Sequence, residues 1–303
     1  MNQEFYQKLC EIVGTEQVLT DEPMKKHTTF RIGGPADYLV LPQKTEEIGE
    51  IVAYCKKMNV PWYVMGNGSN LLVADQGVRG VVIQLLRNFN KIVVQQNKIS
   101  AQAGAGNALI ARQALDASLT GFEFAAGIPG TIGGAVVMNA GAYGGEMKDI
   151  ITEVTVLDEQ GEIQIIPVDN LELGYRTSII ARKGYIVLEV CLELNNGQAD
   201  EIKSRMDELK EQRVTKQPLE YPSAGSTFKR PEGYFAGKLI MDAGLRGFTV
   251  GGAQISEKHC GFVINKGNAT AQDVIDLMEE TKKIVMEKFG VVLEPEVKRL
   301  GQF

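Results

Sequence analysis

Apolar positions recur along the chain at two different spacings, and stretches of the two kinds alternate. A spacing of three to four residues predicts amphipathic helices, which we place at 5–13, 44–58, 107–118, 199–213 and 270–289. Short runs that alternate or are wholly apolar predict strands, which we place at 37–42, 60–66, 80–85 and 184–194. Paired runs predict hairpins at 91–104 about Asn97 and at 152–167 across Gln160 and Gly161. The pattern as a whole predicts an α+β fold.

Local signals mark the ends of several of these elements. Thr45 is expected to cap the second helix. Thr270 with Asp273 resembles a capping box at the start of the last helix, and Gly290 is placed to end it. The final stretch, 291–301, reads as a strand, a proline-containing break and a second strand.

The same reading divides the chain into three parts. A length of 303 residues suggests about two domains, with three small ones possible. The first part alternates strands and helices and ends before the hairpin at 91–104. The run Asn195, Asn196 and Gly197 then breaks the chain ahead of a charged helix. We therefore set the parts at 1–88, 89–197 and 198–303.

Composition and charge exclude several classes of protein. The net charge of -6 argues against broad binding to nucleic acid or to anionic membranes. Four scattered cysteines without a CxxC pair suit neither a zinc site nor a disulfide framework, and two histidines exclude a His-rich metal site. The charged N-terminus is not a signal peptide, and no run approaches the roughly 18 apolar residues of a membrane span. We expect a cytoplasmic protein without a metal.

One short segment, "YPSAGSTFKRP" at 221–231, has two readings. It places Ser223, Ser226 and Thr227 between two prolines. Serine, glycine and proline are ordinary turn residues, so a surface turn is the simpler interpretation. Nucleophilic catalysis by a Ser-His-Asp triad is disfavoured, because the sequence around Ser226 is not the GxSxG elbow. The alternative is a hydroxyl group that does other chemistry.

Two glycine-rich stretches indicate a large ligand. "MGNGSNLLVAD" at 65–75 follows a predicted strand and suits either a diphosphate or a plain turn, at about even odds. The second, at 125–146, places seven glycines within nineteen residues and has few side chains with which to build a core. Together they suggest a dinucleotide held between two α+β subdomains. Neither is a Rossmann fingerprint, because the third glycine of GxGxxG is missing.

Six motifs in order resemble the UDP-N-acetylenolpyruvoylglucosamine reductase family. They are "TTFRIGGPAD" (28–37), "GNGSNLLVAD" (66–75), "GIPGTIGGAVVMNAGAYGGE" (127–146), "GYRTS" (174–178), "SAGSTFKRP" (223–231) and "LEPEV" (293–297). The resemblance implies the FAD-binding fold of the p-cresol methylhydroxylase and vanillyl-alcohol oxidase type, with the flavin held by 1–88 and 89–197 and the substrate by 198–303. It also implies that NADPH reduces non-covalent FAD, leaves, and is replaced at a shared site by the enolpyruvyl UDP-sugar, which becomes UDP-N-acetylmuramate.

The resemblance carries three catalytic residues. Arg176 matches the arginine that stabilises the enolate-like intermediate, for which a permanently charged, bidentate guanidinium is suited. Ser226 matches the donor of the proton to C2. Glu296 matches the third residue, which either hydrogen-bonds to the enolate while protonated or orients a water; Glu294 is the alternative for this position.

The resemblance and the glycine pattern also name binding residues. For FAD these are Gly66, Asn67, Gly68, Ser69, Asn70, Leu71, Gly127, Pro129, Gly130, Thr131, Gly133, Gly134, Ala135 and Asn139. For the substrate they are Tyr175, Arg213, Lys216, Gly225 and Lys229, whereas Ser223 and Thr227 are read as turn and ligand-wall residues and Lys238 and Lys266 as solvated or packing residues. The tyrosine-bearing loop of the longer family form is missing between Tyr175 and Ser226. We expect a monomer of the shorter form.

Two rival readings stay open. Another flavin-dependent oxidase or dehydrogenase of the same superfamily would share the fold, and many of these tether their flavin through a histidine or a cysteine. A non-catalytic module that binds a flavin or a nucleotide sugar would keep the fold without the chemistry. The presence of Arg176, Ser226 and Glu296 together argues against the second reading.

Overall fold

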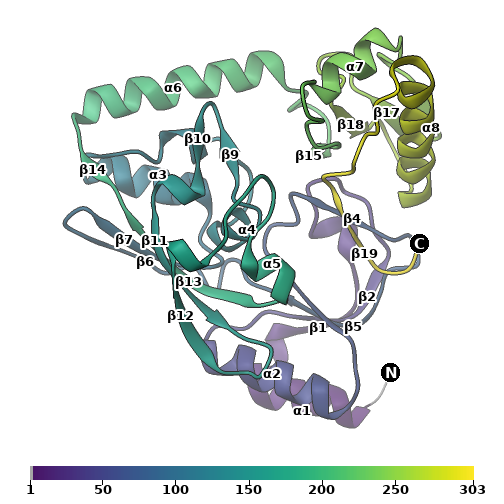
Figure 1. Cartoon of the computed structure of the whole chain (residues 1–303). Helices are drawn as coiled ribbons and strands as arrows, with labels where there is room; N and C mark the ends of the chain where they lie inside the picture. Colours follow the sequence, from purple (N-terminus) through teal and green to yellow (C-terminus); the bar gives the residue numbers. More distant parts are fainter. Residues whose placement is uncertain (1–2) are drawn as a thin grey trace. The chain divides into compact units, whose positions relative to one another are not determined.

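The computed structural model describes residues 3–303, which form two compact units (Figure 1). The first unit contains the chain up to Leu19 together with Tyr38–Asn67 and Gly80–Arg213. The second contains Thr20–Asp37, Gly68–Arg79 and Val214–Phe303. Both units are therefore assembled from segments that are far apart in the sequence.

All five predicted helices are confirmed, and three short ones join them. The helices are α1 (Gln3–Val13), α2 (Thr45–Lys57), α3 (Asn107–Asp116), α4 (Ile132–Val137), α5 (Ile179–Lys183), α6 (Ala199–Lys216), α7 (Ala236–Asp242) and α8 (Ala271–Phe289). Within the described residues, no helix combines the length and apolar character needed to cross a membrane.

The strands up to β12 include both predicted hairpins. They are β1 (Val18–Pro23), β2 (Pro35–Val40), β3 (Trp62–Met65), β4 (Leu71–Val73), β5 (Val78–Gln84), β6 (Ile92–Gln95), β7 (Lys98–Gln102), β8 (Leu119–Thr120), β9 (Gly141–Ala142), β10 (Gly145–Glu146), β11 (Ile151–Leu157) and β12 (Ile163–Pro167). The later strands are β13 (Ile186–Glu193), β14 (Asn195–Asn196), β15 (Ser223–Ser226), β16 (Thr249–Val250), β17 (Ala253–Ile255), β18 (Phe262–Asn265) and β19 (Lys298–Leu300).

A five-stranded antiparallel sheet organises the first unit. Its strand order is β12-β11-β13-β7-β6, so the two predicted hairpins lie at its two edges and β13 joins them. A second sheet of four strands has the order β1-β2-β5-β3, in which β3 runs parallel to β5. Apolar residues of β5, β11 and β13 are buried in one hydrophobic core.

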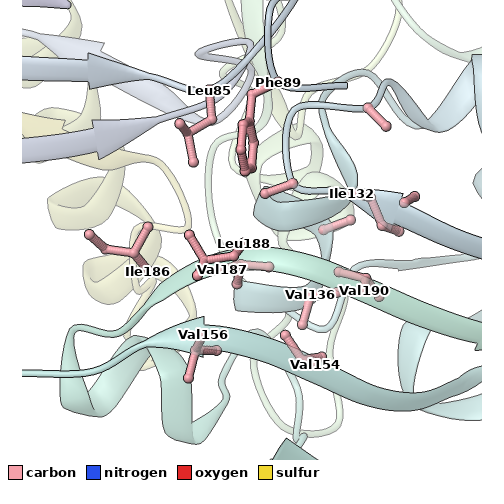
Figure 2. Close-up of a cluster of buried hydrophobic side chains, with 14 of the residues drawn as sticks. Leu85, Phe89, Ile132, Val136, Val154, Val156, Ile186, Val187, Leu188 and Val190 are labelled. Atoms are coloured by element: carbon pink, nitrogen blue, oxygen red, sulfur yellow. The ribbon is translucent and has the colours of Figure 1, made fainter. Parts of the chain in front are cut away.

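Helix α4, which we did not predict from the sequence, packs the second glycine-rich stretch against this core. Figure 2 shows Ile132 and Val136 of α4 near Val190 of β13 and Val154 of β11. Backbone bonds add to this packing, because the Ile132 N–H donates to Ala105 O at 2.8 Å. Complete burial of an isoleucine or valine side chain stabilises by about 1.5–3 kcal/mol, so two such residues fix a segment that otherwise has few side chains.

The second unit has its own sheet and core. Its sheet has the order β15-β18-β17-β16, and α8 packs against β17 and against α7 (Figure 1). The capping box of Thr270 and Asp273 is confirmed at the start of α8, and Gly290 ends the helix in the left-handed conformation. Phe30 and Leu72, which come from early segments, are buried in this core among residues of the C-terminal third.

Two local predictions are wrong. Thr45 is the first residue of α2 and does not cap it; the carboxylate of Glu47 accepts from the N–H groups of Gln43 and Lys44 at 2.7 and 3.3 Å. Residues 291–293 form no strand, since the only ladder contact before β19 is an isolated bridge between Phe228 and Pro295. The break at 195–197 lies between β13 and α6 as predicted, and it contains the two-residue strand β14, which pairs with β8.

His259 in the second unit gives a prediction for stability against pH. Burial lowers the pKa of His259, whose Nδ1 accepts the Gly261 N–H at 3.1 Å. Below the unfolded value of about 6.5 the unfolded chain takes up a proton that the folded chain does not, so stability falls as the pH falls. We expect a contribution of at most about 1.4 kcal/mol per pH unit, measured by urea unfolding between pH 7.5 and 5.

The matched variant is His259→Gln, which keeps an acceptor for the Gly261 N–H but does not titrate. Its stability should decline less steeply with falling pH than that of the wild type. His27 is present in both proteins, so it does not affect the comparison between them. Parallel pH profiles would show that His259 does not resist protonation in the folded state.

Candidate active site

Within the segment at 221–231, Ser223–Ser226 form the edge strand β15 with a bulge, so the reading of this part as a plain surface turn is wrong. Ser223 pairs with Ile264 and Ser226 with Phe262, which leaves one extra residue on β15. Gly225 has a φ of +77°, and a Cβ at this position would meet no atom within 4 Å, so the backbone conformation is what favours glycine. Local turn chemistry suggested a loop, but β18 provides a ladder partner that the local sequence does not reveal.

The three hydroxyl residues of this segment have different environments. Ser226 is exposed, and no hydrogen bond reaches its hydroxyl group from any residue in 3–303. Thr227 is only 1% exposed, and its Oγ1 accepts the Val263 N–H at 2.9 Å. The prediction that Thr227 lines the ligand site is therefore wrong. The backbone carbonyl of Ser223 accepts from Thr29 Oγ1 at 2.7 Å.

Thr227→Val should destabilise the protein, because it removes the acceptor of a buried N–H group and keeps the side-chain shape. We expect a loss of about 1–3 kcal/mol in the free energy of unfolding. Urea denaturation of the purified protein measures this directly. Ser226→Ala is the control, since its exposed side chain should change the stability by less than about 0.5 kcal/mol. Equal stability of Thr227→Val and the wild type would contradict the assigned role.

The structure places the backbone of Glu296 beside the segment that carries Ser226. The Glu296 N–H donates to Thr227 O, and the Lys229 N–H donates to Glu294 O, both at 2.8 Å. Glu296 is partly buried, whereas Glu294 is exposed and forms an ion pair with Lys229 at 3.2 Å. Glu294 therefore has a partner that explains it without a catalytic role.

The second half of the first glycine-rich stretch joins the same neighbourhood. Asn70 Nδ2 donates to Glu296 O at 3.2 Å, and Asn70 O accepts the Lys298 N–H at 2.9 Å. Leu71 opens β4, which pairs in parallel with β19. Gly68 O accepts the Thr29 N–H at 3.3 Å. Within the second unit, predicted cofactor residues and predicted catalytic residues thus lie side by side.

The remaining predicted cofactor residues lie in the first unit, and two stretches of them touch. A Cβ at Gly66 would collide with Thr131 Oγ1, so only glycine permits this approach. Thr131 in turn bridges to Gly106, and the Asn107 N–H donates to Gly130 O at 3.2 Å. The end of β3 and the start of α4 therefore form one continuous surface.

This surface fits a flat or extended cofactor. Gly127, Pro129 and Gly134 are exposed and present backbone with little side chain. A backbone of this kind admits the close approach of a dinucleotide and offers N–H and carbonyl groups to it. The residues present on this surface therefore fit FAD.

Arg176 lies at the tip of a tight turn in the first unit. Gly174 and Thr177 exchange backbone hydrogen bonds of 3.1 and 3.3 Å across it. The Arg176 guanidinium carbon is 5.0 Å from the centre of the Tyr175 ring, and Tyr175 is about half exposed. At this turn the positive charge of Arg176 therefore lies over the Tyr175 ring.

Arg213 is the second cation of the first unit that the sequence singled out. Its Cδ lies 3.3 Å from the place that a Cβ of Gly127 would occupy. Burial lowers the pKa of Arg213, but a guanidinium stays charged at neutral pH. No carboxylate in residues 3–303 forms an ion pair with it. A partly buried cation without an acidic partner, beside exposed glycine backbone, suits an anionic ligand.

The other predicted cations are placed in the second unit. Lys216 is exposed, and Lys229 is paired with Glu294. Lys266 Nζ contacts the hydroxyl group of Tyr221 at 3.0 Å and lies over its ring, in line with the packing role expected for it. Lys238 pairs with Asp242 on α7.

Sequence reasoning missed two carboxylates that organise the site. Asp75 accepts the N–H groups of Ala271 and Gln272 at 2.8 and 3.1 Å and so joins the first glycine-rich stretch to the start of α8. Glu146 accepts from Asn139 Nδ2 at 3.0 Å. Each is the last residue of a quoted motif, and that position was the only signal in the sequence.

Comparisons with known proteins identify the family that this chain resembles. A model described as the C-terminal domain of UDP-N-acetylenolpyruvoylglucosamine reductase matches 217–300, and one described as an FAD binding domain matches 36–166. The UDP-N-acetylenolpyruvoylglucosamine reductases of Agathobacter rectalis and Clostridioides difficile are 55% and 53% identical, and the match covers 100% and 99% of both chains, respectively.

A solved structure extends this similarity to the fold. The UDP-N-acetylenolpyruvylglucosamine reductase of Thermus caldophilus matches with a TM-score of 0.79 and 38% identity, over 92% of this chain and 97% of that one. The predicted α+β fold, with a two-subdomain FAD-binding part and a C-terminal α+β domain, is confirmed. With more than half of its residues identical over the full length, the chain belongs to the UDP-N-acetylenolpyruvoylglucosamine reductase family of FAD-dependent oxidoreductases.

Proposed function

We propose that this protein reduces the enolpyruvyl ether of UDP-N-acetylglucosamine enolpyruvate to UDP-N-acetylmuramate, a precursor of peptidoglycan, with NADPH as the reductant. The observation that carries this proposal is full-length identity of 53–55% to reductases named for that substrate. Bound FAD would supply the hydride that adds to the terminal vinyl carbon. The residues that would hold it are Gly66, Asn67, Gly68, Ser69, Asn70, Leu71, Gly127, Pro129, Gly130, Thr131, Gly133, Gly134 and Ala135.

The first task of the protein is to stabilise negative charge. Addition of a hydride to a carboxyvinyl ether drives charge into the carboxylate and gives an enolate close to a dianion. Preorganised cations aimed at developing charge are commonly the largest protein contribution to such a step. Arg176, on its turn closed by the Gly174 and Thr177 backbone bonds, would grip the carboxylate with two parallel hydrogen bonds.

The second task is to deliver a proton to C2 of the enolpyruvyl group. Ser226 would be the donor, which is supported by an exposed hydroxyl group without a partner in the described chain. A serine is a weak acid, but a carbanion-like carbon needs little acidity when the geometry is fixed. Glu296 would hydrogen-bond to the developing enolate or orient a water, and its backbone is held by Thr227 and Asn70.

The third task is to bind a strongly anionic nucleotide in a protein of net charge -6. Arg213 and Lys216 on α6, and Lys229 after β15, would bind its phosphates. Tyr175 would stack on the substrate or hydrogen-bond near the diphosphate, and Gly225 would let the chain pass close to it. NADPH would use the same site before the substrate binds, in a cytoplasmic monomer. In this scheme 1–88 and 89–197 hold FAD and 198–303 holds the substrate.

An anaerobic two-step experiment tests the function. The bound FAD is reduced with one equivalent of NADPH, UDP-N-acetylglucosamine enolpyruvate is added, and the flavin absorbance is followed. We expect bleaching in the first step and reoxidation in the second, with UDP-N-acetylmuramate as the product. A flavin that stays reduced would refute the proposed substrate. A flavin that remains on the polypeptide after denaturation would favour the rival oxidase reading, and a flavin that NADPH does not reduce would favour a binding module.

A further inference from the structure

The turn that carries Arg176 needs external support. Arg176 has a φ of +56°, in the left-handed region that side chains with a Cβ disfavour. The two backbone bonds between Gly174 and Thr177 close the turn but do not attach it to the rest of the unit. Its position must therefore come from neighbouring segments.

Asn139 provides one of these attachments. It is 1% exposed, and its Nδ2 donates to Gly174 O at 3.2 Å and to Glu146 Oε2 at 3.0 Å. Its Oδ1 accepts the Lys148 N–H at 3.0 Å. Both amide N–H groups are thus used within the protein, and none remains for a ligand.

Glu146 fixes the orientation of the Asn139 amide. A carboxylate only accepts hydrogen bonds, so it selects the Nδ2 side of the amide and leaves Oδ1 for Lys148. The ion pair with Lys148 Nζ at 2.9 Å lowers the pKa of Glu146, and the charge of Arg176 contributes to the same shift. The carboxylate form is therefore the one that holds Asn139 at neutral pH.

The other end of the turn is attached to the same place. Ser178, which is fully buried, donates from its Oγ to Val137 O at 2.8 Å. Val137 ends α4, and Asn139 follows it two residues later. Both ends of the Arg176 turn are thus bonded to 137–139, the end of the predicted cofactor stretch.

We propose that Asn139 is a positioning residue for Arg176, which it serves by holding Gly174 in place. This inference rests on the proposed function for the role of Arg176. It gives the Asn139 amide a task within the protein instead of a hydrogen bond to FAD. One buried side chain then fixes the position of Arg176 relative to the predicted cofactor stretch.

The test compares Asn139→Gly with a matched control, Asn59→Gly, in the FAD-loaded protein. Both asparagines are left-handed, with φ of +41° and +52°, and glycine preserves that backbone. Asn59 is exposed, and its side chain makes no hydrogen bond with residues 3–303. Asn139→Asp is a second variant. Its side chain keeps an acceptor for the Lys148 N–H but cannot donate to Gly174 O. It replaces Asn139→Gly in the experiment if the glycine variant does not fold.

Amide hydrogen exchange is the first readout and does not depend on any substrate. We expect the peptide covering 172–178 to exchange roughly tenfold or more faster in Asn139→Gly and unchanged in Asn59→Gly. FAD affinity, measured by flavin fluorescence, should change by less than about threefold. Unchanged exchange at 172–178 would overturn the proposal, as would a loss of FAD binding comparable to the loss of rate.

A double-mutant cycle is the second readout. Asn139→Gly should slow flavin reoxidation by the enolpyruvyl substrate about 10- to 100-fold, the scale of a misplaced catalytic group. In an Arg176→Ala background the same change should cost less than about threefold, because the residue it positions is gone. Equal slowing in both backgrounds would overturn the proposal. If the wild-type protein does not reoxidise with this substrate, the proposed function fails, and the exchange experiment still decides whether Asn139 holds the turn.

Discussion

Ser226→Ala should slow the reoxidation of reduced flavin by the enolpyruvyl substrate by about 10²–10⁴-fold, while NADPH reduces the flavin at close to the wild-type rate. The reason is that, in the proposed mechanism, the hydroxyl group of Ser226 acts only in the step in which C2 receives its proton. Ser226 is exposed at the end of β15, and its hydroxyl group has no partner among residues 3–303. Its loss should therefore leave the remaining structure intact.

Stopped-flow absorbance measures the two half-reactions separately. Ser204→Ala, on the exposed side of α6, is the control and should leave both rates within about twofold. Equal slowing of both half-reactions by Ser226→Ala would mean that Ser226 places ligands generally and is not the proton donor.

Arg176→Ala should slow the same half-reaction by about 10²–10³-fold or more, because it removes the cation aimed at the enolate-like intermediate. The effect should be on the rate at saturating substrate, since the charge develops only during reaction. Arg176→Lys keeps the charge but not the two parallel bonds of a guanidinium, so we expect it to recover roughly tenfold of the loss.

The measurement is single-turnover reoxidation over a range of substrate concentrations. Arg205→Ala is the control, because Arg205 is an exposed arginine paired with Glu208 on α6. It should leave the rate within about twofold. An Arg176→Ala protein with a normal maximal rate and weaker substrate binding would show that Arg176 binds the ground state and the transition state equally.

Much of the secondary structure could be predicted because it rests on local chemistry. Helices α1, α2 and α8 have apolar stripes at helical spacing, and Thr270 and Gly290 mark both ends of α8. Both hairpins of the five-stranded sheet have short connections between alternating runs. Errors arose where the outcome depended on a partner, as at 221–231, where β18 turns an expected loop into a strand.

Motif order predicted the residues of the candidate site, but it did not predict the hydrogen bonds that hold these residues in place. Ser226, Glu296 and Arg176 were named from the sequence, and their roles stay predictions. The bonds that hold their surroundings came only from the structure: Asn70 to the Glu296 carbonyl, and Asn139 to the turn of Arg176. Asparagine, serine and glycine in a motif do not reveal whether they contact a ligand or the protein, because both need the same donors and acceptors.

From the sequence alone, the five amphipathic helices, the net charge of -6 and the family could be identified, since spacing, charge and motif order are local or additive properties of the chain. The tertiary structure decided which segments share a core. Residues 20–37 and 68–79 belong with the C-terminal third, where Phe30 and Leu72 are buried. A hydrophobic pattern shows that one face of an element is buried, but it does not show which other element covers that face. That partner depends on how the whole chain packs.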